Sequence, residues 1–535
     1  MPRSGSRSSW AVVARAATAL ALKLALLPAL LSGTAVAADA PDPFASNFGV
    51  YPPADSNPPP FEGPYKFRKL SHDYPAQPPE RSWRDVKPKG RITVANAADY
   101  MARLKDYVAP SLRKMIEAPA QWDPASSGWY DMPWMGPADA PGNYDSGRDP
   151  ILGAFTGQII IGASETNSGL KGDTENHTIV YYDRMAATML DKIWKDVRNP
   201  LVDAASFPEG GLVVKAGGVA ATPAEWPVVD GAAIWRVYRP PLKEILDHRL
   251  HGSKAPYTLQ MTDLRVMQFD IIVKDTDAAP ETGWVFTTFV YDKDAPKGTG
   301  AWDQLVPLGA VWGNDPQFDH YPEGHPPGMA LTQFWHNPTA PAYTEATLGW
   351  GGRMSGPIDI AQRHGVILVE GVQRGQLKTD ADCDSPNVKH TDVSGGFHAS
   401  ACLSCHGTAQ SLVPARMYPS PVIADLPPDG TPFCLYTPGG PQWAQWYQNR
   451  PGDQPQLLLP ALLLPAAVST ASMTALPFVR LAPNPTTPVD PQAIHRALTK
   501  VPRGLDYDML LMFAIGNAQT SSQGFTLLPK RTPVH

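Results

Sequence analysis

Five consecutive residues, Cys402-Leu403-Ser404-Cys405-His406, carry the chemistry that can be read most directly from this chain. Two thiols three positions apart lie on one face of a helical turn, so each can add to one of the two vinyl groups of a haem. The imidazole of the next residue then stands below the iron. This spacing is typical of c-type haem attachment, and it predicts one covalently bound haem c with His406 as the proximal iron ligand.

Two other chemistries use cysteines at this spacing. A thioredoxin-like redox pair opens a long helix after a buried strand, whereas this motif follows a segment of Gly, Ser and His, residues 394–400. A zinc site needs two further ligands. The sequence offers four candidates for them: Cys383, His390, His398 and Cys434. The zinc interpretation gives the histidine after the second cysteine no special purpose, so haem attachment explains the motif better.

The chain has only 4 cysteines, and the two outside the motif are Cys383 and Cys434. In an oxidising compartment two remaining thiols have a single possible pairing. The sequence therefore predicts a disulfide between Cys383 and Cys434, which would close the segment that contains the motif. The alternative is that the two thiols are buried separately.

The second axial position of the iron decides whether a haem only passes electrons or also binds a substrate. Met417 follows His406 in a loop flanked by Pro414 and Pro419. Because prolines restrict a loop, this one can hold a thioether in place, and Met417 is the predicted distal ligand. The alternatives are an open or water-bound position and three other side chains: Met473, His390 and His398.

The first 37 residues have the layout of a secretory signal peptide. Basic residues without acidic ones precede an apolar stretch, Leu24 to Leu31, and the small-residue sequence Ala35-Val36-Ala37 follows. This pattern predicts cleavage after Ala37 and a periplasmic mature protein. An uncleaved membrane anchor is the alternative, but the apolar stretch is shorter than the roughly 20 residues that span a bilayer. No second span is predicted, so we expect no transmembrane segment in the mature chain.

The mature chain divides into three predicted segments. Residues 38–150 form a Pro-rich arm, laid on the surface, and a helix; residues 151–378 form a β-rich body; and residues 379–535 form a loop-rich haem c segment. The predicted class is therefore α+β, with a β-rich antiparallel central body, a few helices and the C-terminal haem c segment.

Local patterns place the elements of these segments. Apolar residues at helical spacing predict one helix over residues 95–117, broken near Pro110, and another over 181–197. Antiparallel strands are predicted where short runs are rich in Val, Ile, Phe, Trp and Tyr. These runs are residues 211–216, 233–238, 264–274 and 283–292. The last run has large side chains on both faces, so we expect a central strand covered on both sides.

Composition excludes several classes of protein. A hydrophobic fraction of 43% with 18% charged residues is typical of a globular chain rather than a disordered one. The 59 prolines and 44 glycines disfavour a helical bundle. The net charge is only −6, and the basic residues form no cluster, so the electrostatic footprint of a nucleic-acid-binding protein is missing.

The segment 395–410, which contains the motif, resembles bacterial exported proteins of the c-type cytochrome family. Looser similarity extends over residues 283–316 and 349–357. The resemblance implies thioether attachment at Cys402 and Cys405 and proximal ligation by His406, and it assigns no sixth ligand. The chain is similar to large single-haem members of the family rather than to the small electron carriers.

The sequence leaves two functions open, and they differ in whether the chain is an enzyme. In the first, the haem transfers electrons to or from an unknown periplasmic redox partner, and the β-rich body is a scaffold and docking surface. In the second, the chain is an oxidase-like or peroxidase-like haem enzyme whose body builds a substrate pocket, with Arg353 and His364 as conceivable pocket residues. The length of the chain favours the enzyme, whereas electron transfer assumes less and is the prediction we carry forward.

Overall fold

The computed structural model describes the larger part of the chain. The described residues are 43–44, 70–135, 148–149, 152–160, 169–251, 253, 255, 257–258, 260–296, 300–356, 377–379, 401–411, 433–435, 439–456 and 503–523. The chain separates into two units, Met1–Asp42 and Pro43–His535, and every described residue belongs to the second unit.

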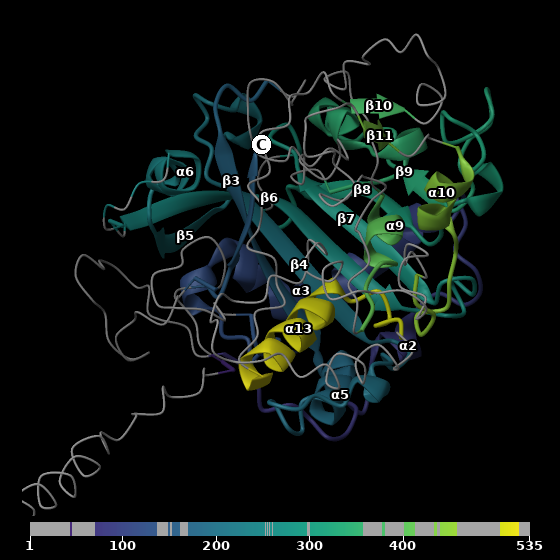
Figure 1. Ribbon diagram of the computed structural model, residues 1–535, viewed down its shortest axis with the longest axis horizontal. Coiled ribbons are helices and arrows are strands. Elements are labelled where there is room, and N and C mark those ends of the chain that lie inside the picture. Colours follow the sequence, from purple (N-terminus) through teal and green to yellow (C-terminus); the bar gives the residue numbers. More distant parts are fainter. Residues whose placement is uncertain are drawn as a thin grey trace, which may run out of the picture. The chain divides into compact units, whose positions relative to one another are not determined.

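The described residues are organised around an antiparallel sheet (Figure 1). Its nine strands are β1 (Trp129–Tyr130), β2 (Phe155–Ile160), β3 (Thr174–Asp183), β4 (Leu212–Val219), β5 (Ile234–Arg239), β6 (Gln260–Lys274), β7 (Trp284–Tyr291), β8 (Leu305–Val311) and β9 (Phe334–His336). Their order is β1-β3-β4-β6-β7-β8-β9, with β2 paired to β3 and β5 paired to β6. A separate parallel pair consists of β10 (Leu377–Thr379) and β11 (Phe433–Leu435). This sheet, together with the helices, confirms the predicted α+β class and its antiparallel body.

The helices are mostly short. They are α2 (Trp83–Val86), α3 (Ala97–Glu117), α5 (Arg184–Ile193), α6 (Leu242–His251), α9 (Cys402–His406), α10 (Pro441–Ala444) and α13 (Met509–Gln523). Short 3-10 helices connect several elements: η2 (Pro119–Gln121), η3 (Val202–Ala204), η4 (Pro227–Val229), η5 (Pro316–Phe318), η6 (Ala342–Thr347), η7 (Trp350–Gly352) and η11 (Gln445–Tyr447).

Both faces of the sheet are covered, and β7 shows the consequence most clearly because all of its residues are buried. Successive side chains of a strand point to opposite faces. Val285 and Phe289 of β7 accordingly join a hydrophobic cluster with α3, whereas Phe286 and Val290 join a second cluster with α5, α9 and α13. The prediction of a central strand covered on both sides is confirmed.

Helix α3 continues through Pro110, so the predicted break is wrong. A proline inside a helix removes one amide donor and leaves the carbonyl four residues earlier without its helical partner. Here that carbonyl belongs to Asp106, and both Asp106 and Pro110 are exposed, so water can satisfy it. The buried residues Leu104 and Leu112, before and after Pro110, hold the two halves of the helix against the sheet.

The predicted helix over residues 181–197 is wrong at both ends. Tyr181 and Tyr182 belong to β3, and α5 begins at Arg184 and ends at Ile193. Asp183 sets the start, because its carboxylate Oδ1 accepts the amide of Ala186 (2.7 Å) in the first helical turn. Burial raises the pKa of Asp183 to about 7, although backbone amides oppose the shift.

Part of the predicted surface arm is anchored in the core instead. Trp83 of α2 is only 1% exposed, and its Nε1 donates to the hydroxyl of Tyr100 on α3 (3.3 Å). The residues 38–69, except 43–44, lie outside the described residues. Three tryptophans that follow β7 in the chain are also buried: Trp302, Trp312 and Trp350.

Candidate haem attachment site

Helix α9 presents the cysteines and the histidine of the motif on a single helical stretch that is fixed at its start. The amide of Cys402 donates to the carbonyl of Met354 (2.8 Å), and the hydroxyl Oγ of Ser404 accepts the amide of Ala401 (3.1 Å). These bonds satisfy amides that a helix leaves unpaired at its N-terminus. Leu403 is fully buried in the cluster that α9 shares with β7 and α13.

The two cysteines differ in exposure. Cys405 is buried at 6% exposure, whereas Cys402 is half-buried. The Sγ of Cys405 lies 3.7 Å from the Sδ of Met509, the first residue of α13.

The orientation of His406 is fixed by one hydrogen bond and one ring contact. Its Nδ1 lies 2.9 Å from the carbonyl oxygen of Tyr507, and its ring packs edge-on against Phe286 of β7 with centroids 4.8 Å apart. A carbonyl oxygen can only accept, so Nδ1 must carry the proton. The other ring nitrogen, Nε2, then holds the lone pair that can bind a metal.

Tyr507 is itself held at its far end. Its hydroxyl donates to the carbonyl of Arg450 (2.9 Å), and burial raises the pKa of Tyr507 to about 12. The side chain therefore stays neutral and hydrogen-bonded, while its carbonyl faces His406. Gly407, next to the motif, packs close to the same tyrosine: a Cβ at this position would lie 3.4 Å from the Tyr507 ring and 2.9 Å from the Leu403 carbonyl.

Arg353, a conceivable pocket residue from the sequence, ties loops together near the motif. Its guanidinium is buried and donates to four main-chain carbonyls: Asn314 (3.0 Å), Gly324 (2.9 Å), Trp350 (3.2 Å) and Asp315 (3.4 Å). Its charge also faces the rings of Trp350 and Tyr447, at 4.5 and 5.3 Å from their centroids. Burial lowers the pKa of Arg353 and raises that of Tyr447, whose phenol shares a hydrogen bond with Ser404 of the motif.

Several predicted residues lie outside the described residues: Cys383, His364, His390, His398, Met417 and Met473. Cys434 belongs to β11, whose backbone pairs in parallel with β10 at Lys378. Since Cys383 lies outside the described residues, the disulfide between these two cysteines stays a prediction.

Sequence reasoning missed three neighbours of the motif: Phe286, Tyr507 and Met509. Phe286 lies in a predicted strand, but nothing in the pattern links that strand to His406. A local signal for α13 does exist, because Asp508 precedes the apolar run that begins at Met509. The carboxylate of Asp508 accepts the amide of Leu511 (3.0 Å), as a helix-capping residue does.

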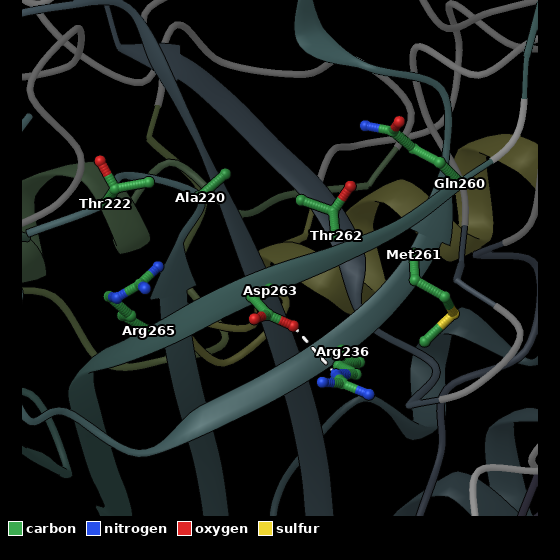
Figure 2. Close-up of a pocket in the computed structure, with 8 residues that line it drawn as sticks. All are labelled: Ala220, Thr222, Arg236, Gln260, Met261, Thr262, Asp263 and Arg265. Carbon is green, nitrogen blue, oxygen red and sulfur yellow. Dashed lines mark hydrogen bonds and ion pairs between the residues drawn. The ribbon is translucent and has the colours of Figure 1, made fainter. Parts of the chain in front are cut away.

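An open pocket of about 530 Å³ lies elsewhere, along β5 and β6 (Figure 2). Residues of these strands and of the chain after β4 line it: Ala220, Thr222, Arg236, Gln260, Met261, Thr262, Asp263 and Arg265. Figure 2 shows Arg236 and Asp263 paired across the two strands, with 2.9 Å between Nε and Oδ1. None of the residues of the Cys402–His406 motif lines this pocket.

Comparison of the chain with known protein families, with curated proteins and with solved structures finds no match.

Among the described residues, no three or more His, Cys, Asp or Glu side chains are grouped so that they could hold a metal ion. The zinc interpretation therefore depends on residues outside the described ranges. Within those ranges, no helix combines the length and the apolar character that crossing a bilayer requires.

Proposed function

We propose that the chain is a periplasmic c-type haem protein that transfers electrons through one covalently bound haem. Cys402 and Cys405 would attach the haem through thioether bonds, and His406 would bind the iron through Nε2. When bound, the haem supplies the one-electron couple of its iron. In this proposal, the signal peptide that ends at Ala37 directs the chain to the periplasm.

The observation that carries the proposal is the hydrogen bond between His406 Nδ1 and the Tyr507 carbonyl. A histidine that ligates a metal typically donates its other ring N–H to a carbonyl or carboxylate, which selects the tautomer and orients the ring. His406 has this arrangement directly after two thiols on the same turn. A redox-active cysteine pair would need no such support for the next residue.

The donor chemistry of the site fits the group. Imidazole and thioether side chains are ordinary partners of haem c. The surroundings are apolar, because Leu403, Cys405 and Phe286 belong to one buried cluster. An apolar environment keeps reorganisation around the iron small, which suits a group that gains and loses an electron.

The test is whether the mature protein retains haem after acid-acetone extraction, with a mass that exceeds the polypeptide by one haem. The double variant Cys402→Ala with Cys405→Ala should lose the covalent haem. The matched control is Cys383→Ala with Cys434→Ala, which also removes two cysteines and should keep it. Covalent haem in the first variant, or none in the unmodified protein made with a haem attachment system, refutes the proposal.

A polar group on the haem-motif face of the sheet favours a second candidate, a haem redox enzyme. Asp270 and Thr288 are cross-strand partners two residues from Ile272 and Phe286, so all four side chains share that face. Gln268 Nε2 donates to Asp270 Oδ2 (2.5 Å), while the buried Gln268 Oε1 lacks a hydrogen-bond partner among the described residues. Polar side chains buried on this face could serve a substrate or its protons.

Carbon monoxide distinguishes the two candidates. An iron with two protein ligands binds carbon monoxide slowly or not at all, whereas an open distal position admits it rapidly. We expect the ferrous protein to resist carbon monoxide if its function is electron transfer. Rapid binding by the unmodified protein would instead favour the enzyme.

A further inference from the structure

Residues 505–508, which carry the carbonyl that faces His406, form a tight and strained turn. The amide of Asp508 donates to the carbonyl of Leu505 (3.0 Å), and both central residues have positive φ, 52° at Asp506 and 65° at Tyr507. Turns with positive φ at both central positions normally use Gly, Asn or Asp there. A bulky residue such as Tyr507 adopts this conformation only when its surroundings impose it.

The carboxylate of Asp506 supplies the strongest of these restraints. It is 2% exposed and accepts three hydrogen bonds from three separate segments. Oδ1 accepts from Lys274 Nζ of β6 (2.6 Å) and from Trp284 Nε1 of β7 (2.7 Å), while Oδ2 accepts the amide of Phe207 (2.7 Å). Hydrogen bonds to an ionised group are about twice as strong as neutral ones. The turn is therefore fixed to the sheet at its first central residue.

A loop holds the turn from its other side. The amide of Asp506 donates to the carbonyl of Gly452 (2.9 Å), and the hydroxyl of Tyr507 donates to the carbonyl of Arg450 (2.9 Å). Gly452 is required for this approach, since a Cβ there would lie 1.8 Å from Asp506 Oδ1. The turn thus has almost no freedom to rotate the Tyr507 carbonyl away from His406.

We propose that Asp506, held by Lys274, is a positioning residue for His406. It fixes the strained turn whose Tyr507 carbonyl accepts the proton of His406 Nδ1. The effect of Asp506 on the iron rests on the proposed function. Its effect on the imidazole rests on the hydrogen-bond network alone. A carbonyl held in place makes the imidazole a better electron donor and so favours ferric over ferrous iron.

The test compares Asp506→Asn and Lys274→Met with Lys87→Met in the full mature chain. Lys87 is a matched control because it also pairs with a buried carboxylate, Asp275, at 2.5 Å, and both lysines are 13% exposed. Haem content, the reduction potential and the exchange of the His406 Nδ1 proton in D₂O, followed by NMR with labelled histidine, are measured for each variant.

Both site variants should keep their haem and shift the ferrous-to-ferric balance about tenfold towards ferrous iron, which is 59 mV for one electron. The His406 Nδ1 proton should exchange at least tenfold faster in both, and Lys87→Met should change neither quantity. Asn adopts the left-handed conformation readily, so Asp506→Asn should fold. If it does not, Lys274→Met still tests the network, because Asp506 keeps its bonds from Trp284 and Phe207 in that variant.

The outcomes separate this inference from the proposed function. If the unmodified protein holds no haem, the proposed function fails, and the proton-exchange comparison on the haem-free chain still decides the positioning role. Unchanged exchange in both site variants overturns the inference whether or not haem is present. An equal change of the exchange rate or of the reduction potential in Lys87→Met overturns the inference as well, because the change would then result from a general loss of stability.

Discussion

Removing one hydroxyl group from Tyr182 would test how α13 is tied to the sheet. The Tyr182 hydroxyl donates to Asp508 Oδ2 (2.8 Å), and both side chains are buried. Tyr182→Phe keeps the ring and leaves one carboxylate oxygen without this donor. Since a hydrogen bond to a charged group contributes about 1.5–3 kcal/mol, we expect the free energy of unfolding to fall by about 2 kcal/mol when Asp508 is ionised.

This penalty should depend on pH. Burial raises the pKa of Asp508 from its ordinary value of 3.8 to about 6, and the bonds from Leu511 and Tyr182 oppose the shift. Between these values the folded chain keeps a proton that the unfolded chain has lost, so stability falls as the pH rises through this window. Tyr182→Phe removes a bond that favours the ionised form and raises the folded pKa further. The penalty should therefore grow from about 1 kcal/mol at pH 5 to about 2 kcal/mol at pH 8.

Urea unfolding followed by tryptophan fluorescence at both pH values measures the effect. Tyr181→Phe is the matched control, because the neighbouring Tyr181 is equally buried but donates to a neutral acceptor, the Leu152 carbonyl (3.2 Å). Its penalty should be about 1 kcal/mol at either pH. A Tyr182→Phe penalty that does not change between pH 5 and pH 8, or that equals the control at both, would refute the reasoning.

Three further outcomes are expected. Met417→Ala should remove the weak near-infrared band of a thioether ligand from the ferric protein and create carbon monoxide binding in the ferrous protein, whereas a surviving band would shift the assignment to Met473 or another methionine. Non-reducing peptide mapping of protein from the periplasm should find Cys383 joined to Cys434, and recovery of both as free thiols would contradict the pairing. Leu403→Ala should lower the free energy of unfolding by about 2–5 kcal/mol, because it leaves a cavity between α9 and the sheet. Leu201→Ala, at a side chain that is 57% exposed, should change the free energy of unfolding by less than about 0.5 kcal/mol in the same urea assay.

The strands of the body could be predicted because their signal is local. Runs of β-branched and aromatic residues between turn residues predict β4, β5, β6 and β7, and the sheet contains them. The boundary between β3 and α5 could not be predicted in the same way, since Tyr181 continues the spacing of Met185 and Met189. Helix spacing alone does not show where a strand ends, and here the capping bond of Asp183 decides it.

The candidate site divides along the same line. Cys402, Cys405 and His406 are predicted from five adjacent residues, because the proposed haem attachment needs them at that spacing. The Tyr507 carbonyl that orients His406 is 101 residues away, and a backbone acceptor leaves no mark on residue type. Only the folded chain shows which carbonyl takes that place.

This separation along the chain also sets an order of assembly. The ribosome adds about 5–20 residues per second, so the 101 residues between His406 and Tyr507 take roughly 5 to 20 s to synthesise. During that interval the two thiols and the imidazole exist without the carbonyl that later orients the imidazole. The motif is therefore complete in sequence before this hydrogen bond can form, and the bond forms when the last part of the chain folds onto the sheet.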